Sequence, residues 1–228
     1  KGAADFVSAA DLKAEQVVFE ALSKARPGYS FLGEERGMIE GTDKTHTWIV
    51  DPLDGTTNFL HAIPHFAITI ALQREGAIVA GVTFNPITNE LFWAEKGKGA
   101  FVNDKRLRVS ARKHLDEAVV ATGIPFLGHG QHARFLKELH QVSQRVAGVR
   151  RFGSAALDLA FVAAGRFDAF WERDLKAWDM AAGLLMVTEA GGLVRDADGG
   201  ETMLESGSVC AGTQEIQPLL QDKLRAAA

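Results

Sequence analysis

The chain has 228 residues, of which 46% are hydrophobic and 24% are charged, and its formal net charge is −4. This length and composition are enough for a sizeable core, in one large domain or two small ones. The modest negative charge argues against a general polyanion-binding protein, and the single Cys210 excludes an internal disulfide framework.

No apolar run approaches the ~20 residues that a membrane-spanning helix needs. We therefore expect no membrane association, and the single cysteine favours a reducing compartment, so we expect a cytoplasmic protein. The chain begins at Lys1 rather than at a methionine, and we expect that a leader or a first helix is missing from it.

The first part of the chain predicts one helix followed by many strands. Residues 8–28 predict a helix in which Ser8 is the N-cap and Pro27-Gly28 ends the run. The segments "YSFLGEE" and "THTWIVDP" predict short strands that end in carboxylates. Residues 66–110 alternate in hydrophobicity between turn residues such as Gly97-Lys98-Gly99, which predicts antiparallel meander strands.

The second part mixes helices and strands. In chain order we expect a helix over 131–146, a strand over 149–152, the helix "SAALDLAFVAAG", the strand "FDAFWE", the helix "WDMAAGLLMVTEAGG", the strands "GLVRD" and "SVCAG", and a final helix from Gln214. The change of pattern lies between Arg108 and Gly128. We divide the chain there into an N-terminal α+β half, 1–115, and a C-terminal α/β half, 116–228, within one compact catalytic unit.

The stretch "WIVDPLDGTTNFLHAIPHF" places two aspartates three residues apart at the end of a predicted buried strand. Asp51-Pro52 alone suggests a turn, Asp54-Gly55 is a common turn pair, and the two threonines could cap a helix. Together, however, these residues concentrate two acids, and carboxylates that lie close must share a cation or raise a pKa. A hard divalent ion such as Mg²⁺ suits oxygen ligands of this kind.

Further acids extend this candidate metal site. Glu34-Glu35 ends a predicted strand, and because neighbours on a strand point to opposite faces, we expect only one of the two to face a shared site. Asp11 and Asp179 each stand at the start of a predicted helix, where an N-cap is the ordinary interpretation. Free backbone N–H groups at Gly55-Thr56-Thr57 would bind phosphate. Metal-holding acids beside them suggest metal-dependent phosphoryl transfer or hydrolysis.

The segments "GEE", "WIVDPLDGTTNF" and "WDMAAGLLMVTEAGG", in this order, resemble the inositol monophosphatase family, and "FVSAAD", "KGKGAF" and "FGSAALDLAFVAAG" also fit. The resemblance covers nearly the whole chain. It implies a lithium-sensitive, Mg²⁺-dependent phosphomonoesterase. The implied fold is a layered αβαβα sandwich of mixed and antiparallel sheets, and members of the family are usually dimers. It also implies one or two helices before "FVSAAD", a part that the given sequence does not contain.

The resemblance implies a role for each matching residue. The implied ligands of two Mg²⁺ ions are Glu34, Asp51, the backbone carbonyl of Leu53, Asp54 and Asp179. Asp51 bridges the ions, and Glu34, rather than Glu35, matches the family's ligand in "GEE". Asp11 aligns with an acid near a third, looser metal and the attacking water, which Thr56 and Glu34 position and activate.

The resemblance also implies substrate contacts. They comprise the phosphate-binding amides of Gly55 and Thr56, the metal ligands Asp54 and Asp179, the turn Gly153, Ser154 and Ala155, and Glu172, which accepts hydrogen bonds from inositol hydroxyls. Ser154 replaces a threonine that is common in the family. Cys210 falls in a predicted buried strand, so it is a core residue rather than a nucleophile.

The implied reaction is hydrolysis of inositol 1-phosphate to inositol and phosphate by a metal-activated water, and the implied partners are a small phosphorylated cyclitol or sugar and a second copy of the chain. Fructose 1,6-bisphosphate, histidinol phosphate, NADP and 3′-phosphoadenosine nucleotides stay open as substrates. Some bacterial members of the family are also associated with transcription machinery and RNA. The net charge of −4 does not favour direct nucleic-acid binding.

Overall fold

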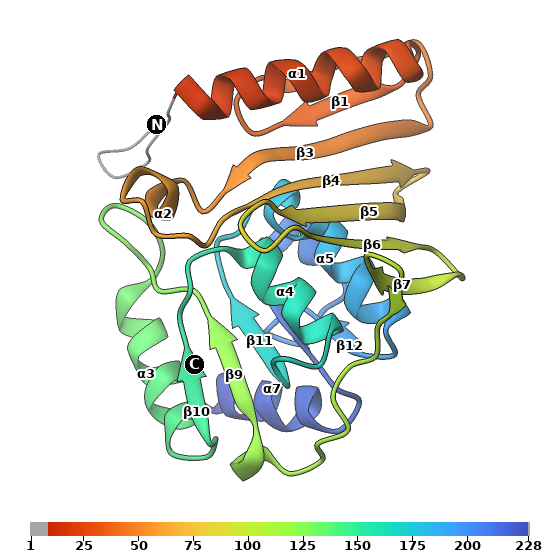
Figure 1. Cartoon of the computed structure of the whole chain (residues 1–228). Coiled ribbons are helices and arrows are strands. Elements are labelled where there is room, and N and C mark those ends of the chain that lie inside the picture. Colours follow the sequence, from red (N-terminus) through yellow and green to blue (C-terminus); the bar gives the residue numbers. More distant parts are fainter. Residues whose placement is uncertain (1–8, 228) are drawn as a thin grey trace.

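The structure, a computed structural model, describes residues 9–227. Within these residues the strands form one sheet of eight and one of five (Figure 1). Helix α1 (Ala9–Ala25) covers the outer face of the first sheet, and α4 (Ala155–Ala163) and α5 (Ala177–Glu189) lie between the two sheets. Helices α3 (His132–Ser143) and α7 (Ile216–Ala226) cover the outer face of the second sheet. The predicted αβαβα sandwich is therefore confirmed.

The first sheet is an antiparallel meander extended by a parallel pair. In spatial order its strands are β2 (Gly37–Ile39), β1 (Ser30–Gly33), β3 (His46–Asp54), β4 (Ala67–Arg74), β5 (Ala77–Asn85), β6 (Glu90–Glu95), β7 (Gly99–Val102) and β8 (Lys105–Arg106). Strands β1 and β3 run parallel, and every other neighbouring pair is antiparallel. The predicted meander is confirmed.

The second sheet is mixed. In spatial order its strands are β10 (Gly148–Arg150), β9 (Val119–Thr122), β11 (Ala169–Glu172), β13 (Val209–Gly212) and β12 (Leu193–Arg195). The first three run parallel, and β13 is antiparallel to both of its neighbours. Three short elements complete the described chain: α2 (Thr56–Leu60), η1 (Leu115–Glu117) and α6 (Met203–Ser206).

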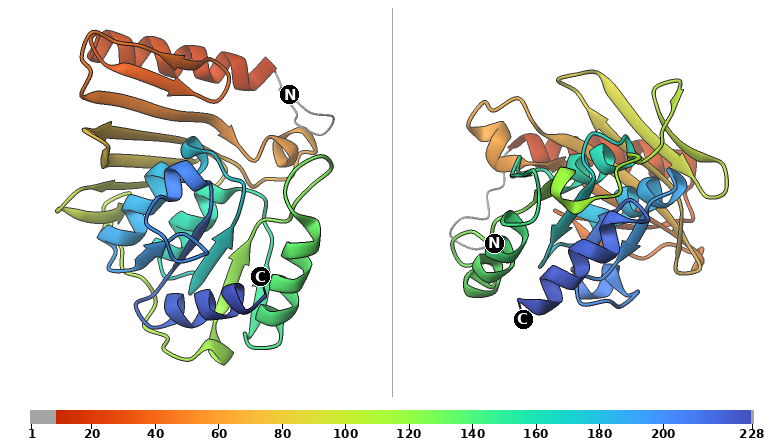
Figure 2. Two further views of the ribbon diagram at one scale, coloured as in Figure 1. Left: turned by 180° about the vertical axis from the view of Figure 1, so that it is seen from behind. Right: turned by 90° about the horizontal axis from the view of Figure 1, so that it is seen from below.

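The main core lies between the two sheets. Helices α4 and α5 are buried around most of their circumference because each contacts a sheet and the other helix. Close packing explains one glycine there, since a Cβ at Gly81 of β5 would lie only 2.8 Å from the Cα of Ala182. A smaller cluster, which includes Trp171 and Cys210, joins residues of the second sheet to residues of α3 and α7. Figure 2 shows these two helices on the outer face of that sheet. Cys210 is fully buried, as its predicted core role requires.

The first four residues of the "KGKGAF" segment, 96–99, are named here the KGKG loop. This loop connects the meander to α5. Gly97 and Gly99 both adopt positive φ, and their N–H groups donate to the carboxylate of Glu189 at 2.7 and 2.9 Å. Glu189 is the last residue of α5. The loop therefore anchors the end of the helix whose first turn carries Asp179.

The structure corrects several predicted boundaries. The strand "YSFLGEE" ends at Gly33, so Glu34 and Glu35 lie in the following turn. Strands β2 and β9 and helix α6 were not predicted, and other predicted helices and strands differ at their ends by a few residues. Ser8, the predicted N-cap, lies outside the described residues. The division into halves at residue 115 stays a prediction. Between residues 9 and 227, no helix is both long and apolar enough to cross a bilayer.

Candidate active site

The end of β3 departs from regular strand geometry, and this departure directs two carboxylates. Asp51 pairs with Thr69 of β4 and Asp54 pairs with Ala67, so β3 carries one extra residue between the two pairs. In a regular strand, residues three apart point to opposite faces. The irregularity lets Asp51 and Asp54 approach the same point, and Pro52, which has no N–H for the ladder, is tolerated at such a bulge.

Asp179 completes this first carboxylate cluster. Oxygen atoms of Asp51, Asp54 and Asp179 all lie within 4.8 Å of one another. Asp179 stands in the first turn of α5, where its side chain accepts a hydrogen bond from the N–H of Lys176 at 2.7 Å. Lys176 occupies the N-cap position, so the N-cap interpretation of Asp179 is wrong and the helix start instead aims its carboxylate at β3.

The three carboxyl groups of the first cluster have raised pKa values, because they are buried and lie close to other carboxylates. Burial, followed by the carboxylates of Asp54, Glu34 and Asp179, raises the pKa of Asp51 well above its usual range. Burial and Asp54 raise the pKa of Asp179 to about 8. Burial raises the pKa of Asp54 to about 6 despite its hydrogen bonds. A cation among these oxygens would relieve the repulsion, and a donor set of oxygens alone suits a hard divalent ion.

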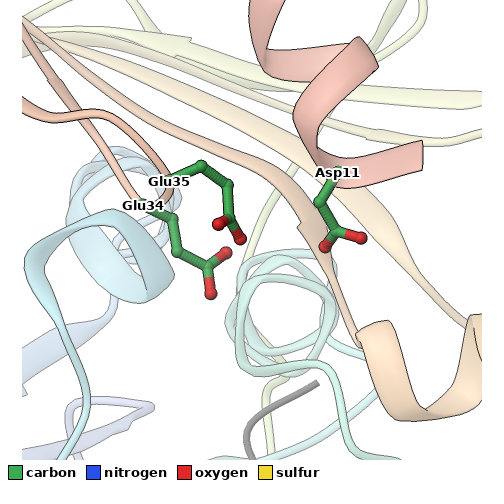
Figure 3. Close-up of side chains that lie close together, drawn as sticks. All are labelled: Asp11, Glu34 and Glu35. Atoms are coloured by element: carbon green, nitrogen blue, oxygen red, sulfur yellow. The ribbon is translucent and has the colours of Figure 1, made fainter. Parts of the chain in front are cut away.

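A second cluster joins α1 to the turn after β1 (Figure 3). Oxygen atoms of Asp11, Glu34 and Glu35 lie within 4.8 Å of one another. Figure 3 shows the Asp11 side chain extending from the helix and lying across from the two glutamates. The expectation that only one glutamate faces the site is wrong. The strand ends at Gly33, and the alternation of side chains does not extend into the turn, where Glu34 donates its N–H to the carbonyl of Val50 at 3.2 Å.

Glu15 holds this turn and was missed by the sequence analysis. It lies one helical turn after Asp11, is only 1% exposed, and accepts the N–H of Glu35 at 2.8 Å. Its carboxylate also pairs with Arg36 at 3.3 Å. A Cβ at Gly33 would lie 2.4 Å from Glu15 Oε2, so the glycine makes room for the carboxylate. The available signal was an acid placed four residues after Asp11, on the same face of the helix.

Gly55 and Thr56 connect the two clusters. Gly55 has φ of 96°, a left-handed conformation suited to glycine, and α2 starts at the next residue. The Thr56 hydroxyl lies 3.1 Å from Asp11 Oδ1 and 3.0 Å from the carbonyl oxygen of Leu53. The structure thus brings Thr56 to Asp11 and Leu53, and its functional pairing with Glu34 stays a prediction.

The N-terminus of α4 reaches across to β3. Ser154 is the N-cap of α4, and its hydroxyl donates to Asp54. The N–H of Ala156 donates to the same carboxylate oxygen at 2.9 Å. Asn58 of α2 supplies a second link, because its side-chain amide donates to the carbonyls of His65 and Phe152 at 2.8 Å each. These bonds place the turn around Ser154 beside the first cluster.

One cleft of about 560 Å³ brings the predicted substrate contacts together. Its lining includes all eight of them: Asp54, Gly55, Thr56, Gly153, Ser154, Ala155, Glu172 and Asp179. Glu172 ends β11, and burial, with the carboxylates of Asp179 and Asp54, raises its pKa to about 8. The lining also contains the segment 122–126 and Arg151, which the sequence analysis did not select.

Comparison with known proteins decides the family. The model of the "Inositol monophosphatase family" matches residues 1–228. The chain belongs to this family. Within the inositol monophosphatase family, an inositol-1-monophosphatase of Caulobacter vibrioides is 69% identical over 230 residues, which cover 100% of this chain and 90% of that protein.

Other proteins similar to this chain carry a different name. The Nus factor SuhB of Escherichia coli K12 is 43% identical over 99% of this chain and 84% of its own length. The crystal structure of the extragenic suppressor protein SuhB from Bartonella henselae matches with a TM-score of 0.96 at 57% identity, covering 99% of this chain and 88% of that one.

Proposed function

We propose that this chain hydrolyses inositol 1-phosphate to inositol and phosphate. The observation that carries the proposal is the convergence of Asp51, Asp54 and Asp179 within 4.8 Å at a cleft that also contains Gly55 and Thr56. Such a site can bind both metal and phosphate. The relative named inositol-1-monophosphatase, 69% identical to this chain, supports the choice of substrate.

We infer that the metal is Mg²⁺, with two or three ions. The donors are carboxylate and carbonyl oxygens, and the carboxylates are buried against their own repulsion, which fits a hard divalent cation. Glu34, Asp51 and the Leu53 carbonyl would hold one ion, Asp51, Asp54 and Asp179 a second, and Asp11 a looser third. Ions held by these residues would activate a water and neutralise charge on the phosphate and the leaving alkoxide.

The chain's own residues position the reactants. Thr56 and Glu34 orient the attacking water, the Glu34 carboxylate accepts its proton, and a second water protonates the leaving alkoxide so that inositol is released. Thr56 is suited to this task because its hydroxyl is fixed between Asp11 and the Leu53 carbonyl. The backbone N–H groups of Gly55 and Thr56 donate to phosphate oxygens. No covalent intermediate is required, since phosphate monoester hydrolysis depends mainly on positioning and charge neutralisation.

The substrate's polyol part occupies the opposite side of the cleft. Gly153, Ser154 and Ala155 contact it at the start of α4, where Ser154 is already fixed by its bond to Asp54. Glu172 accepts hydrogen bonds from the hydroxyl groups. Because Glu172 stands at the end of β11, on the second sheet, substrate binding would use both sheets of the sandwich.

Asp51→Asn tests the proposal most directly. Activity should depend on Mg²⁺ and should be nearly abolished in the variant, because Asp51 is the one ligand assigned to both ions. Asp104→Asn, a change of an exposed turn aspartate, is the matched control. A folded Asp51→Asn protein that turned over within a few fold of the parent would refute the two-metal assignment.

Lithium should inhibit more strongly as the substrate concentration rises, and Asp179→Asn should weaken that inhibition.

Substrate choice needs a separate measurement. A panel at fixed Mg²⁺ should compare inositol 1-phosphate with fructose 1,6-bisphosphate, histidinol phosphate, NADP and a 3′-phosphoadenosine nucleotide. We expect the highest kcat/KM for inositol 1-phosphate, and a clear preference for another compound would refute our choice.

The relatives named Nus factor SuhB support a second candidate function in transcription. If the chain has it, the Asp51→Asn variant should keep its partner while losing turnover. We also propose a homodimer, which light scattering would test, and a cytoplasmic location, in keeping with the free, buried Cys210.

A further inference from the structure

A glycine stands where the Glu172 carboxylate meets the neighbouring strand. Gly123 directly follows β9, and β11 runs parallel beside it with Trp171 paired to Thr122. A Cβ added at Gly123 would lie 1.8 Å from Glu172 Oε1, 2.0 Å from its Cδ and 2.4 Å from its Oε2. The carboxylate of Glu172 therefore occupies the space that the side chain of any other residue would need.

This close approach concerns the carboxylate rather than the backbone. The three atoms nearest to the added Cβ all belong to the end of the Glu172 side chain. Gly123 does not adopt positive φ, so alanine is compatible with its backbone. Gly41 shows the opposite case, because a Cβ there would meet the backbone of Gly28 at 2.2 Å and of Tyr29 at 2.5 Å. Alanine at 123 should thus move a side chain and leave the fold intact.

We propose that Gly123 is a specificity-determining residue, which allows the Glu172 carboxylate to lie against the end of β9 and there accept hydrogen bonds from the substrate's hydroxyl groups. This inference rests on the proposed function of Glu172. Real contacts of a Cβ are essentially never shorter than 3.0 Å, so a methyl group at 123 would displace Oε1 by about 1.2 Å. A displacement of ~1 Å is enough to misalign polar groups with a bound substrate.

The test is a double-mutant cycle on Gly123→Ala and Glu172→Ala. KM and kcat are measured at fixed Mg²⁺ for inositol 1-phosphate and for 4-nitrophenyl phosphate, whose leaving group has no aliphatic hydroxyl. At a pH above about 8, where Glu172 is ionised, Gly123→Ala should raise KM for inositol 1-phosphate, approaching the roughly tenfold to 150-fold effect expected for loss of hydrogen bonds to a charged group. The aryl phosphate should change little. In the Glu172→Ala background, Gly123→Ala should have no further effect.

Two controls separate specificity from stability. Gly200→Ala is the matched substitution, because its added Cβ would meet nothing closer than 3.6 Å and its φ is not positive. Product inhibition supplies a readout beside turnover. Gly123→Ala should weaken inhibition by inositol and leave inhibition by inorganic phosphate unchanged, whereas partial unfolding would lower kcat for both substrates and change neither inhibition constant.

The outcomes are distinguishable. If Glu172→Ala raises KM selectively and Gly123→Ala behaves like the parent, the inference about Gly123 is overturned and the proposed function stands. If Gly123→Ala affects both substrates equally, or adds to Glu172→Ala, the residue acts on the metals or the fold and the inference is also overturned. If the parent hydrolyses neither substrate, the proposed function fails, and the inference fails with it.

Discussion

The substitution Asn58→Asp hardly changes the shape of the side chain, but it should break the hydrogen bonds that link α2 to the turn before α4. Asn58 is only 4% exposed, and its NH₂ group donates to the carbonyls of His65 and Phe152 at 2.8 Å each. An ionised aspartate cannot donate, so both carbonyls lose their partner. The link between α2, which carries Thr56, and the turn before α4 would then be lost.

The expected cost follows from the two bonds. Leaving a buried carbonyl without a donor costs ~1–3 kcal/mol, so two such losses lower the free energy of unfolding by roughly 2–6 kcal/mol. Burial raises the pKa of the new carboxyl above its ordinary ~3.9 in the folded state. The neutral acid can donate to one carbonyl again. Stability is therefore retained below the unfolded pKa and lost as the pH rises through the folded one.

Urea unfolding at about pH 5.5 and about pH 8, with the parent measured beside the variant, tests this reasoning. The free energy of unfolding of the variant should fall further below that of the parent at the higher pH. The kcat for inositol 1-phosphate should also fall, because the phosphate-binding turn becomes less rigid. Asn89→Asp is the matched control, since Asn89 is exposed and has φ of 54°, which aspartate also tolerates. A deficit below ~0.5 kcal/mol at both pH values would refute the argument.

Three further outcomes are expected. Burial raises the pKa of Cys210 to about 12, so iodoacetamide should modify this thiol only after unfolding, as mass spectrometry would show. The contribution of Cys210 to the free energy of unfolding should decline as the pH rises from ~8.5 towards 12. Glu189→Ala should free the KGKG loop and lower the free energy of unfolding by ~1–3 kcal/mol without raising KM, as urea unfolding and kinetics would show. Glu15→Ala, which removes the acceptor of the Glu35 N–H and the partner of Arg36, should weaken apparent Mg²⁺ affinity by ~10–100-fold in a Mg²⁺ titration of activity.

The sequence allowed the layers of the fold to be predicted, because long segments with a clear hydrophobic period form them. Strands β4, β5 and β6 carry this signal, and α5 is a long, mostly apolar segment. Strand β2 and helix α6 do not, since three or four residues are too few to show a period. The chemistry of Asp51 and Asp54 could be predicted from their spacing, but their common direction depends on the bulge in β3.

The missed site residues depend on contacts that have no local signature. Glu15 meets Glu35 across 20 residues of sequence, and Gly123 meets Glu172 between two different strands. The alternation of side chains along a strand does not apply to Glu34-Glu35, because β1 ends at Gly33. The residue types indicated a metal site, whereas the partners that orient them required the tertiary structure.

The hydrogen bond from Ser154 to Asp54 joins positions 100 residues apart. During synthesis, β3 leaves the ribosome well before α4 and α5, and its aspartates have no partners until the later elements pack against them. A nascent or truncated chain that ends before Asp179 lacks both the helix that packs against the first sheet and one carboxylate of the first cluster. A metal bound at the first cluster would stabilise only molecules in which α5 has packed against β3, so a metal-induced rise in melting temperature would report the assembly of both sheets around that helix.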